Sequence, residues 1–356
     1  MFSKFLGSKD KRNIELAALA TVTDVAPLLG FNRTIVKAGL EQLNADPLPG
    51  IREIMRAAGR AGIEITVYDL GWVIGPRLNA SGRLVDAKKS LSLFIEDDPE
   101  KITQSAQELN SLNEDRQGKT LDMYGLAEDF DKDHLPKIIF SESSEYHEGI
   151  IGLVAARLTQ KYFRPSIVVS LADGMGKGSV RSVKGFDVTE FLRRFEDLFV
   201  SLGGHPMAAG FSIEQKNISE LKKRIIEEAD KSLSDELLIP EILIDLDIPA
   251  KIIEPNLLSE IDKMKPFGMG NEEPVFAAKN LGVSEISLMG KENQHARIKF
   301  YKDGKYLKGV LFDGAKEAEK YKYGDVIDAA FYLKKNEYNG SIYVDLIIKD
   351  MKKSNG

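Results

Sequence analysis

The chain has 356 residues, of which 43% are hydrophobic and 29% are charged, and its formal net charge is -6. This length suffices for two or three folded domains, and the acidic balance excludes a protein that is basic throughout. The sequence contains no cysteine, which excludes disulfides and thiolate metal sites and agrees with a cytoplasmic location. No signal peptide is apparent, and no segment approaches the ~18 apolar residues of a membrane span, so we expect no membrane partner.

Residues 14 to about 127 are predicted to be mainly helical, because apolar residues recur there with helical spacing. Within this region, residues 69–95 are interpreted as a glycine- and arginine-rich turn between two apolar segments. From Pro99 to about Gly118 the sequence predicts a polar helix with a narrow apolar stripe, which suits a connection between two domains.

Residues 136 to about 232 are predicted to form an α/β domain, because β-rich runs flank a helical segment in a strand–helix–strand pattern. Asp187 lies near the start of a further amphipathic segment. The expected strands are 136–143, 165–173 and 176–182, and the expected helices are 150–162 and 186–202.

Residues 240–352 are predicted to form a small β-barrel, with hairpin signals at Asp303-Gly304 and Asn339-Gly340. One such barrel is the OB fold, a common binder of single-stranded nucleic acid. Strand alternation assigns some of its aromatic residues to the core and leaves others free to stack on bases. The candidates for stacking are Phe300, Tyr301, Phe331, Tyr332, Tyr338 and Tyr343.

The stretch SLGGHPMAAGFSI, residues 201–213, has a pattern that no ordinary helix or strand requires. Gly203 and Gly204 permit backbone conformations that are closed to other residues, and small residues follow His205. An anionic group of a ligand could therefore lie against the main chain beside His205. A tight turn is the alternative interpretation.

The segment GKGSVRSVKG offers groups that bind phosphate: backbone N–H groups, the hydroxyls of Ser179 and Ser182, and the guanidinium of Arg181, with Lys177 nearby. From Gly149 to Phe186 six lysines and arginines stand against one acid, a balance of +5 within an acidic chain. A solvated charged face is the alternative.

Three further places carry candidate residues. Asp24 is a carboxylate in a largely apolar run; if buried, it needs a metal ion or a basic partner, whereas a helix cap or a surface loop would keep it hydrated. His147 precedes a helix, where an imidazole can cap the helix, bind phosphate or shuttle a proton. Arg77, Asn79 and Arg83 flank glycines and a proline, which suggests an anion clamp or else a surface loop.

An ordered set of motifs resembles the RecJ family of single-strand-specific exonucleases, in the DHH phosphoesterase superfamily, from about Ile14 to Lys352. The motifs are ATVTDVAPL, LGWVIGPRLNASGRL, YHEGIIGLVAARL, GKGSVRS, GGHPMAAG, PFGMGNEEPVF and NEYNG. The resemblance implies a multi-domain α/β protein. Its parts would be the helical tail of a DHH domain (1–98), a connecting helix and linker (99–135), an α/β DHH-associated domain (136–235) and an OB-fold barrel (240–352).

The resemblance also implies roles for individual residues. Asp24 matches an aspartate that ligates catalytic Mn²⁺ or Mg²⁺, and Arg83, with Arg77 and Asn79 nearby, matches a motif lining the substrate path. His205 matches a histidine that faces the active site. The matches to phosphate-binding parts of the associated domain are His147, Ser179, Arg181, Ser182, Gly203 and Gly204.

The family function is 5′-to-3′ hydrolysis of single-stranded DNA in repair and recombination, with DNA as the partner. The sequence departs from the family because it contains no Asp-His-His triplet, and its four histidines are never adjacent. Asp24 alone cannot hold two metal ions, so we expect the isolated chain not to cleave DNA. The alternatives are a non-catalytic DNA-binding fragment, a member of the small-nucleotide branch, or one half of a split enzyme that docks a missing DHH half in trans. Contact with a single-strand-binding protein is left open.

Overall fold

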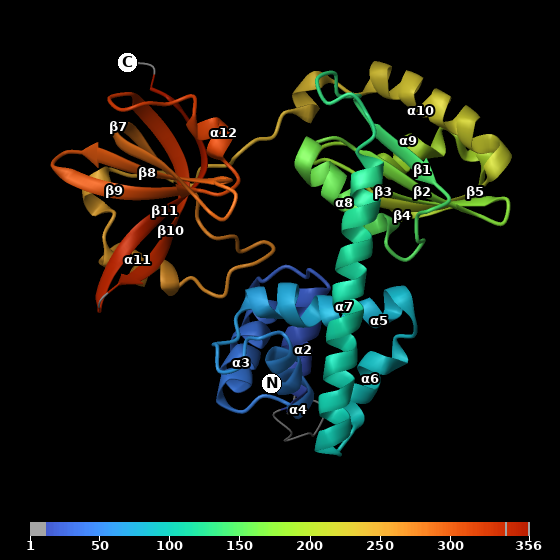
Figure 1. The fold of residues 1–356 in the computed structure, drawn as a ribbon, viewed down its shortest axis with the longest axis horizontal. Helices are drawn as coiled ribbons and strands as arrows, with labels where there is room; N and C mark the ends of the chain where they lie inside the picture. The colour runs from blue at the N-terminus through green and yellow to red at the C-terminus, as the bar shows by residue number, and fades with distance from the viewer. Residues whose placement is uncertain (1–11, 339, 355–356) are drawn as a thin grey trace. The chain divides into compact units, whose positions relative to one another are not determined.

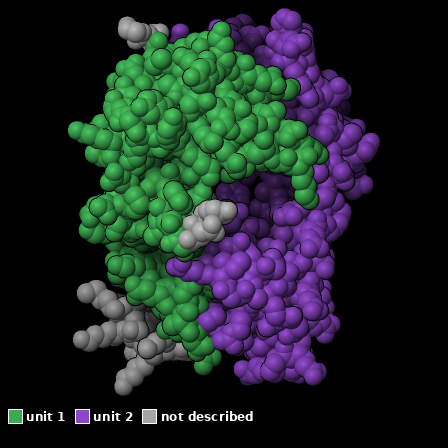
Figure 2. Space-filling model, turned by 60° about the vertical axis from the view of Figure 1, so that its left-hand side comes forward, with its two compact units in different colours: residues 1–46, 65–67, 242–356 green, residues 47–64, 68–241 purple. Residues whose placement is uncertain are grey.

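The computed structural model describes residues 12–338 and 340–354, so Asn339 of the expected Asn339-Gly340 turn and the side chain of Tyr338 lie outside the described residues. Among these residues no helix is long and apolar enough to cross a membrane. The chain divides into two compact units, coloured separately in Figure 2. Unit 1 comprises residues 1–46, 65–67 and 242–356, and unit 2 comprises residues 47–64 and 68–241.

Unit 1 begins with a tightly packed helix pair, α2 (Arg12–Thr23) and α3 (Gly30–Ala45), as the apolar spacing predicts. A Cβ added at Gly39 would lie 2.3 Å from the Cβ of Ala18, so two small residues set this close approach. The side chain of Asn44 binds both backbone groups of Ile65, at 2.9 and 2.7 Å, and thereby joins residues 65–67 to the pair.

The rest of unit 1 is a closed five-stranded barrel, visible in orange and red in Figure 1. Its strand order is β10-β11-β9-β8-β7, closed by pairing of β10 with β7, and β6 adds to the outer edge of β7. Phe300 and Phe331 are fully buried in its core, as strand alternation predicts for part of the aromatic set. The elements are β6 (Leu246–Asp247), α11 (Pro255–Asp262), β7 (Phe276–Met289), β8 (His295–Lys302), β9 (Lys305–Leu311), α12 (Ala315–Ala318), β10 (Val326–Tyr338) and β11 (Ser341–Lys353).

The loop between α11 and β7 is bonded to the helix pair. Arg33 on α3 donates hydrogen bonds to the carbonyls of Met264 and Lys265, at 2.7 and 3.0 Å. The N–H of Leu28 donates to the carbonyl of Met269 at 2.6 Å. Residues 266–270 (PFGMG), in the loop between α11 and β7, therefore bind the turn that follows α2.

Within residues 69–95 of unit 2, a glycine- and arginine-rich turn was expected between two apolar segments, and this expectation is wrong because the segment between them is helical. The segment forms a π-helical turn, η1 (Asp69–Ile74), followed directly by α5 (Gly75–Leu84) and α6 (Lys88–Ile95). Pro76 lies just after the junction of η1 and α5, inside a continuous helical run, so the π-helical turn absorbs the irregularity that a proline introduces there. The preceding helix is α4 (Pro49–Ala57).

The connecting helix α7 (Pro99–Ala127) has 29 residues and runs beyond the end expected near Gly118. The side chain of Asp98 caps its start by accepting from the N–H of Glu100 at 2.9 Å. Its last turns bury Met123, Tyr124 and Ala127 in a core shared with the next helix, and this burial explains the extension.

The α/β part of unit 2 is a five-stranded sheet of order β1-β2-β3-β5-β4, in which only β1 and β2 are parallel. Helix α8 and the end of α7 share one apolar core with the sheet, and α9 and α10 share another (Figure 1). The elements are β1 (Ile139–Ser143), α8 (Ile151–Tyr162), β2 (Ser166–Ala172), β3 (Met175–Arg181), α9 (Val188–Arg193), β4 (Phe199–His205), β5 (Ala208–Glu214) and α10 (Ile218–Ser232).

Two expectations for residues 186–213 are wrong. Helix α9 ends at Arg193, and Phe199 begins strand β4, because its ring packs on that of Phe211 with centroids 4.8 Å apart. The stretch 201–213, whose pattern was not expected of an ordinary strand, forms most of an antiparallel hairpin, β4 and β5. The glycines therefore lie within strands.

A carboxylate holds the end of α7 to α8. Glu128 accepts hydrogen bonds from the hydroxyls of Tyr124 and Tyr162 and from Lys161 Nζ, the last at 2.6 Å. Burial would raise the pKa of Glu128, but these hydrogen bonds outweigh it and hold the pKa at about 2. The ion pair therefore survives at mildly acidic pH.

Replacing Glu128 by Gln should lower the free energy of unfolding by about 2 kcal/mol at neutral pH, because a charged acceptor for three donors is lost. Since the folded pKa is depressed, this stabilisation is present above the ordinary value of 4.5 and is lost as the pH falls toward 2. Urea unfolding at neutral pH and near pH 3 should show the difference between variant and wild type shrink to less than half. Glu108→Gln, at an exposed pair with Lys89, is the control; an unchanged difference would contradict the account.

Candidate functional site

The open face of strands β3, β5 and β4 carries a polar surface with almost no side chains in its middle. Strand register places residues directly opposite one another in three rows. In every row the residue on the central strand β5 is glycine, alanine or serine. The rows, taken across β3, β5 and β4, are Lys177–Ser212–Ser201, Ser179–Gly210–Gly203 and Arg181–Ala208–His205.

Arg181 is fixed at the edge of this face. Its Nη1 donates to the hydroxyl of Ser179 at 3.2 Å and to the carbonyl of Val180 at 2.8 Å. A Cβ added at Gly152, in the first turn of α8, would lie 3.0 Å from Ser179 Oγ and 3.1 Å from Arg181 Nη2. Glycine at this position therefore lets the guanidinium rest on the start of a helix, where backbone N–H groups and the helix dipole favour anions.

Arg83 approaches the same place from the end of α5. Its Nη1 donates to the carbonyl of Gly149 at 3.3 Å, and a Cβ at Gly149 would lie only 2.2 Å from the Arg83 carbonyl oxygen. His147 is exposed beside this contact, and its Nδ1 accepts from the N–H of Gly149 at 3.1 Å. Glycine at 149 is thus required for α5 and the start of α8 to meet.

Arg116 on α7 is a member of this cluster that the sequence analysis missed. Its guanidinium donates to Asn113 Oδ1 at 2.9 and 3.3 Å. Burial and the charge of Arg83 lower the pKa of Arg116, and the same two causes lower the pKa of Arg181. The sequence feature that could have identified Arg116 is Asn113, a polar residue in the buried stripe of the helix, one turn before this arginine.

Among the described residues, no acidic partner binds these arginines. In the part of the chain that the structure describes, Arg83, Arg116 and Arg181 make no ion pair. Arg83 and Arg181 line an open groove of about 510 Å³, and the charge of Arg116 acts on Arg83 beside it. The groove's lining includes Arg83, Gly152, Lys177, Ser179, Arg181 and Gly210. Its one carboxylate, Glu148, is 2.5 Å from Lys177 Nζ and offsets that charge alone.

Other predicted residues do not join this groove. Ser182 is buried, and its hydroxyl donates to the carbonyl of Phe186 at 2.7 Å, so the expected phosphate contact by this side chain is not supported. Arg77 braces α5 against α7 by donating to Asn110 Oδ1 at 2.9 Å and to the carbonyl of Val73 at 2.8 Å. Asn79 is exposed on α5. These positions were expected to form a clamp because the helix was interpreted as a turn.

Asp24 lies in unit 1, in the exposed turn after α2, where its N–H donates to the carbonyl of Ala20 at 2.9 Å. Because Asp24 is exposed, its carboxylate is hydrated and does not need a counter-ion. Among the described residues no three His, Cys, Asp or Glu side chains gather closely enough to hold a metal ion. These residues therefore do not by themselves fit the two-metal centre that the family resemblance implies.

The comparisons with known proteins agree with the two β-containing domains. The DHHA1 domain family matches residues 135–234, and the RecJ OB domain family matches residues 244–350. A curated relative, the single-stranded-DNA-specific exonuclease RecJ of Bacillus subtilis, is 30% identical over 97% of this chain and 44% of its own length. The RecJ of Thermus thermophilus is 32% identical over 95% of this chain and 48% of its own length.

Solved structures of RecJ also resemble this chain over nearly its whole length. The crystal structure of Thermus thermophilus RecJ with Mg²⁺ matches with a TM-score of 0.83 at 30% identity, over 99% of this chain and 54% of that one. A second structure of the same protein with Mn²⁺ gives 0.85 at 29% identity.

The arginine-rich groove thus lies on a DHHA1 domain, and the chain is a DHHA1 protein with an appended OB barrel. It is, more particularly, a homologue of the exonuclease RecJ over nearly its whole length. The chain spans about half the length of these relatives. The expected fold class is confirmed, whereas the division into domains and the roles of single residues stay predictions.

The two glycines before His205 should respond differently to alanine. A Cβ at Gly203 would meet nothing within 4 Å, whereas a Cβ at Gly204 would lie 2.5 Å from the Ala208 carbonyl oxygen and 2.6 Å from Ala209 Cα. Gly204→Ala should therefore lower the melting temperature by several degrees. Gly203→Ala should leave it unchanged or raise it slightly, because glycine weakens strands. Thermal melts of both variants decide this, and equal destabilisation would contradict the hairpin described here.

Proposed function

We propose that this chain binds single-stranded DNA as part of a RecJ-type exonuclease. The arginine groove of the DHHA1 domain binds backbone phosphates, and the OB barrel holds the strand at a further place. The observation that carries the proposal is the cluster of Arg83, Arg116 and Arg181, which has no acidic partner within the described residues. The names of the relatives support DNA as the ligand, because each is called a single-stranded-DNA-specific exonuclease.

Charge and shape both favour phosphate in this groove. The half-buried guanidinium group of Arg83 is repelled by those of Arg116 and Arg181, so an anion bound beside Arg83 and Arg181 would offset this repulsion. Guanidinium forks match phosphate oxygens in two-point geometry. Gly203 and Gly210 leave bare backbone on the adjoining sheet face, where a strand can approach closely without meeting side chains.

Hydrolysis needs more than the described residues supply. The relatives' structures contain Mg²⁺ or Mn²⁺, but Asp24 is the one residue here that the family resemblance assigns to metal. We therefore propose that 5′-to-3′ cleavage requires carboxylates and histidines beyond those described here. On its own, the chain acts as a non-catalytic binder of single strands.

Removing the cluster should weaken DNA binding and its dependence on salt. Arg83→Ala and Arg181→Ala should each lower the affinity for a single strand of about 30 nucleotides by roughly tenfold. Each should reduce the slope of log affinity against log salt by about 0.7, the value for one phosphate contact on a single strand.

Fluorescence anisotropy at several salt concentrations measures both quantities. The control is Arg193→Ala, which removes an exposed arginine of the same domain that is already paired with Glu190. If both groove variants kept the wild-type slope, phosphate would not be the ligand of the groove.

The isolated chain should bind a 5′-labelled single strand without cleaving it, with or without Mn²⁺, because its metal donors are incomplete. Denaturing gels of the labelled strand, read beside a binding assay, test this. Robust Mn²⁺-dependent cleavage that disappears in Asp24→Ala would show that carboxylates of this chain do complete the site.

A further inference from the structure

The turn that carries Asp24 has a strained main chain. Val25, the next residue, has a φ of 55°, in the left-handed region that a β-branched residue rarely adopts. The N–H of Ala26 donates to the carbonyl of Thr21 at 3.0 Å, so Val25 ends α2 at a position where glycine or asparagine is usual. The side chain of Val25 is 59% exposed, so its own packing does little to offset the strain.

A loop of the barrel domain binds the residues that follow this position. The N–H of Leu28 donates to the carbonyl of Met269 at 2.6 Å. Leu28 is buried, and a Cβ added at Gly268 would lie 2.6 Å from Leu28 Cδ1. Glycine at position 268 therefore lets residues 266–270 close directly onto the turn, whereas a side chain there would push the loop and the turn apart.

The loop is held in shape by its own hydrogen bonds. Gly268 and Asn271 exchange backbone hydrogen bonds at 2.9 and 3.0 Å. Asn271 Nδ2 donates to the carbonyls of Met264 and Pro266, at 3.1 and 2.8 Å. Arg33 on α3 donates to the same Met264 carbonyl at 2.7 Å. The loop is therefore a preformed element that is fixed to the helix pair at two places, at the turn and at Arg33.

This arrangement exceeds what a connection between two helices requires. Asparagine at position 25 would end α2 with less strain, and a surface turn needs no second domain to hold it. Strained main chain that other parts of a protein maintain is found most often at functional sites. The residue whose direction these contacts set is Asp24, which lies just before the strained position.

We propose that residues 264–271 of the barrel domain are a positioning element for Asp24, because they hold the strained turn and thereby fix the direction of the Asp24 Cα–Cβ bond. The inference rests on the proposed function in one respect, since it takes Asp24 to belong to the reacting site of the exonuclease. Gly268 and Arg33 are positioning residues that act through the turn. The barrel domain thus has a second task besides holding the strand.

The test measures amide hydrogen exchange and the residual dipolar couplings of N–H bonds in the isotopically labelled chain. Gly268→Ala should speed exchange of the Leu28 amide about tenfold, because the added Cβ separates the loop from the turn. It should also move the couplings of Asp24 and Val25 toward zero, while those within α2 and α3 keep their wild-type values. Gly118→Ala is the control, because Gly118 is exposed on α7 and an added Cβ meets nothing within 4 Å.

Two further variants separate positioning from stability. Val25→Asn should raise the melting temperature by a few degrees, because asparagine tolerates the left-handed conformation. Combined with Gly268→Ala, it should restore the couplings of residue 24 toward their wild-type values, since the turn then keeps its shape without the loop. Arg33→Ala should move the same couplings in the same direction as Gly268→Ala. Circular dichroism should show every variant folded.

Faster exchange of the Leu28 amide with unchanged couplings at Asp24 and Val25 would show that the loop only adds stability, and would overturn the inference. Unchanged exchange in both Gly268→Ala and Arg33→Ala would also overturn it. None of these measurements uses DNA. Failure of the proposed function would appear instead as normal strand binding by Arg83→Ala, so the two failures are distinguishable.

Discussion

Three arginines that form no ion pair within the described residues are the constraint on which the groove of unit 2 depends. Arg83 lies on α5, Arg116 on α7 and Arg181 on β3. Arg116 and Arg181 each lie close enough to Arg83 for their charges to interact with its charge. Gly149 and Gly152 make the approach possible, because any side chain there would meet Arg83 or Arg181. The chain bears this electrostatic cost in its free state, and we infer that a polyanionic strand relieves it.

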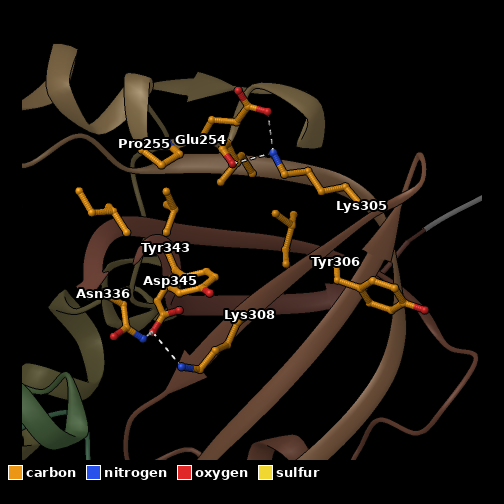
Figure 3. A pocket seen from close by; sticks show the side chains of 12 residues that line it. Glu254, Pro255, Lys305, Tyr306, Lys308, Asn336, Tyr343 and Asp345 are labelled. Atoms are coloured by element: carbon orange, nitrogen blue, oxygen red, sulfur yellow. Dashed lines mark hydrogen bonds and ion pairs between the residues drawn. The ribbon is translucent and has the colours of Figure 1, made fainter. Parts of the chain in front are cut away.

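The two proposed contact sites differ in the physical forces that they use. The groove on the DHHA1 domain presents guanidinium groups that form no ion pair among the described residues, whereas the OB barrel presents the exposed rings of Tyr306 and Tyr343 beside paired charges (Figure 3). Phosphates are common to every nucleotide, and every base has a face that stacks. The groove, as we propose it, therefore binds a strand through phosphates without selecting its sequence.

Much of the fold could be predicted from local patterns. Helical spacing identified α2, α3 and α8, and the strand–helix–strand pattern identified β1, α8 and β2. Errors arose where glycine and proline were interpreted as breakers, at α5 and at the β4–β5 hairpin. Pro76 lies where a π-helical turn runs directly into α5, and Gly203 and Gly204 lie within the paired strand β4. Arg116 was missed because its neighbour Arg83 is distant in sequence and nothing local links them.

The central claim is that the arginine groove binds phosphates of a single strand, and NMR of the arginine side chains tests it most directly. The Nε–Hε signals would be followed while a short thymidine oligonucleotide is added to the labelled chain. The account predicts that the signals of Arg83, Arg116 and Arg181 shift together and saturate, while those of Arg193 and Arg224, each paired with an acid, stay in place. Binding that leaves the signals of the three groove arginines unmoved would contradict the account.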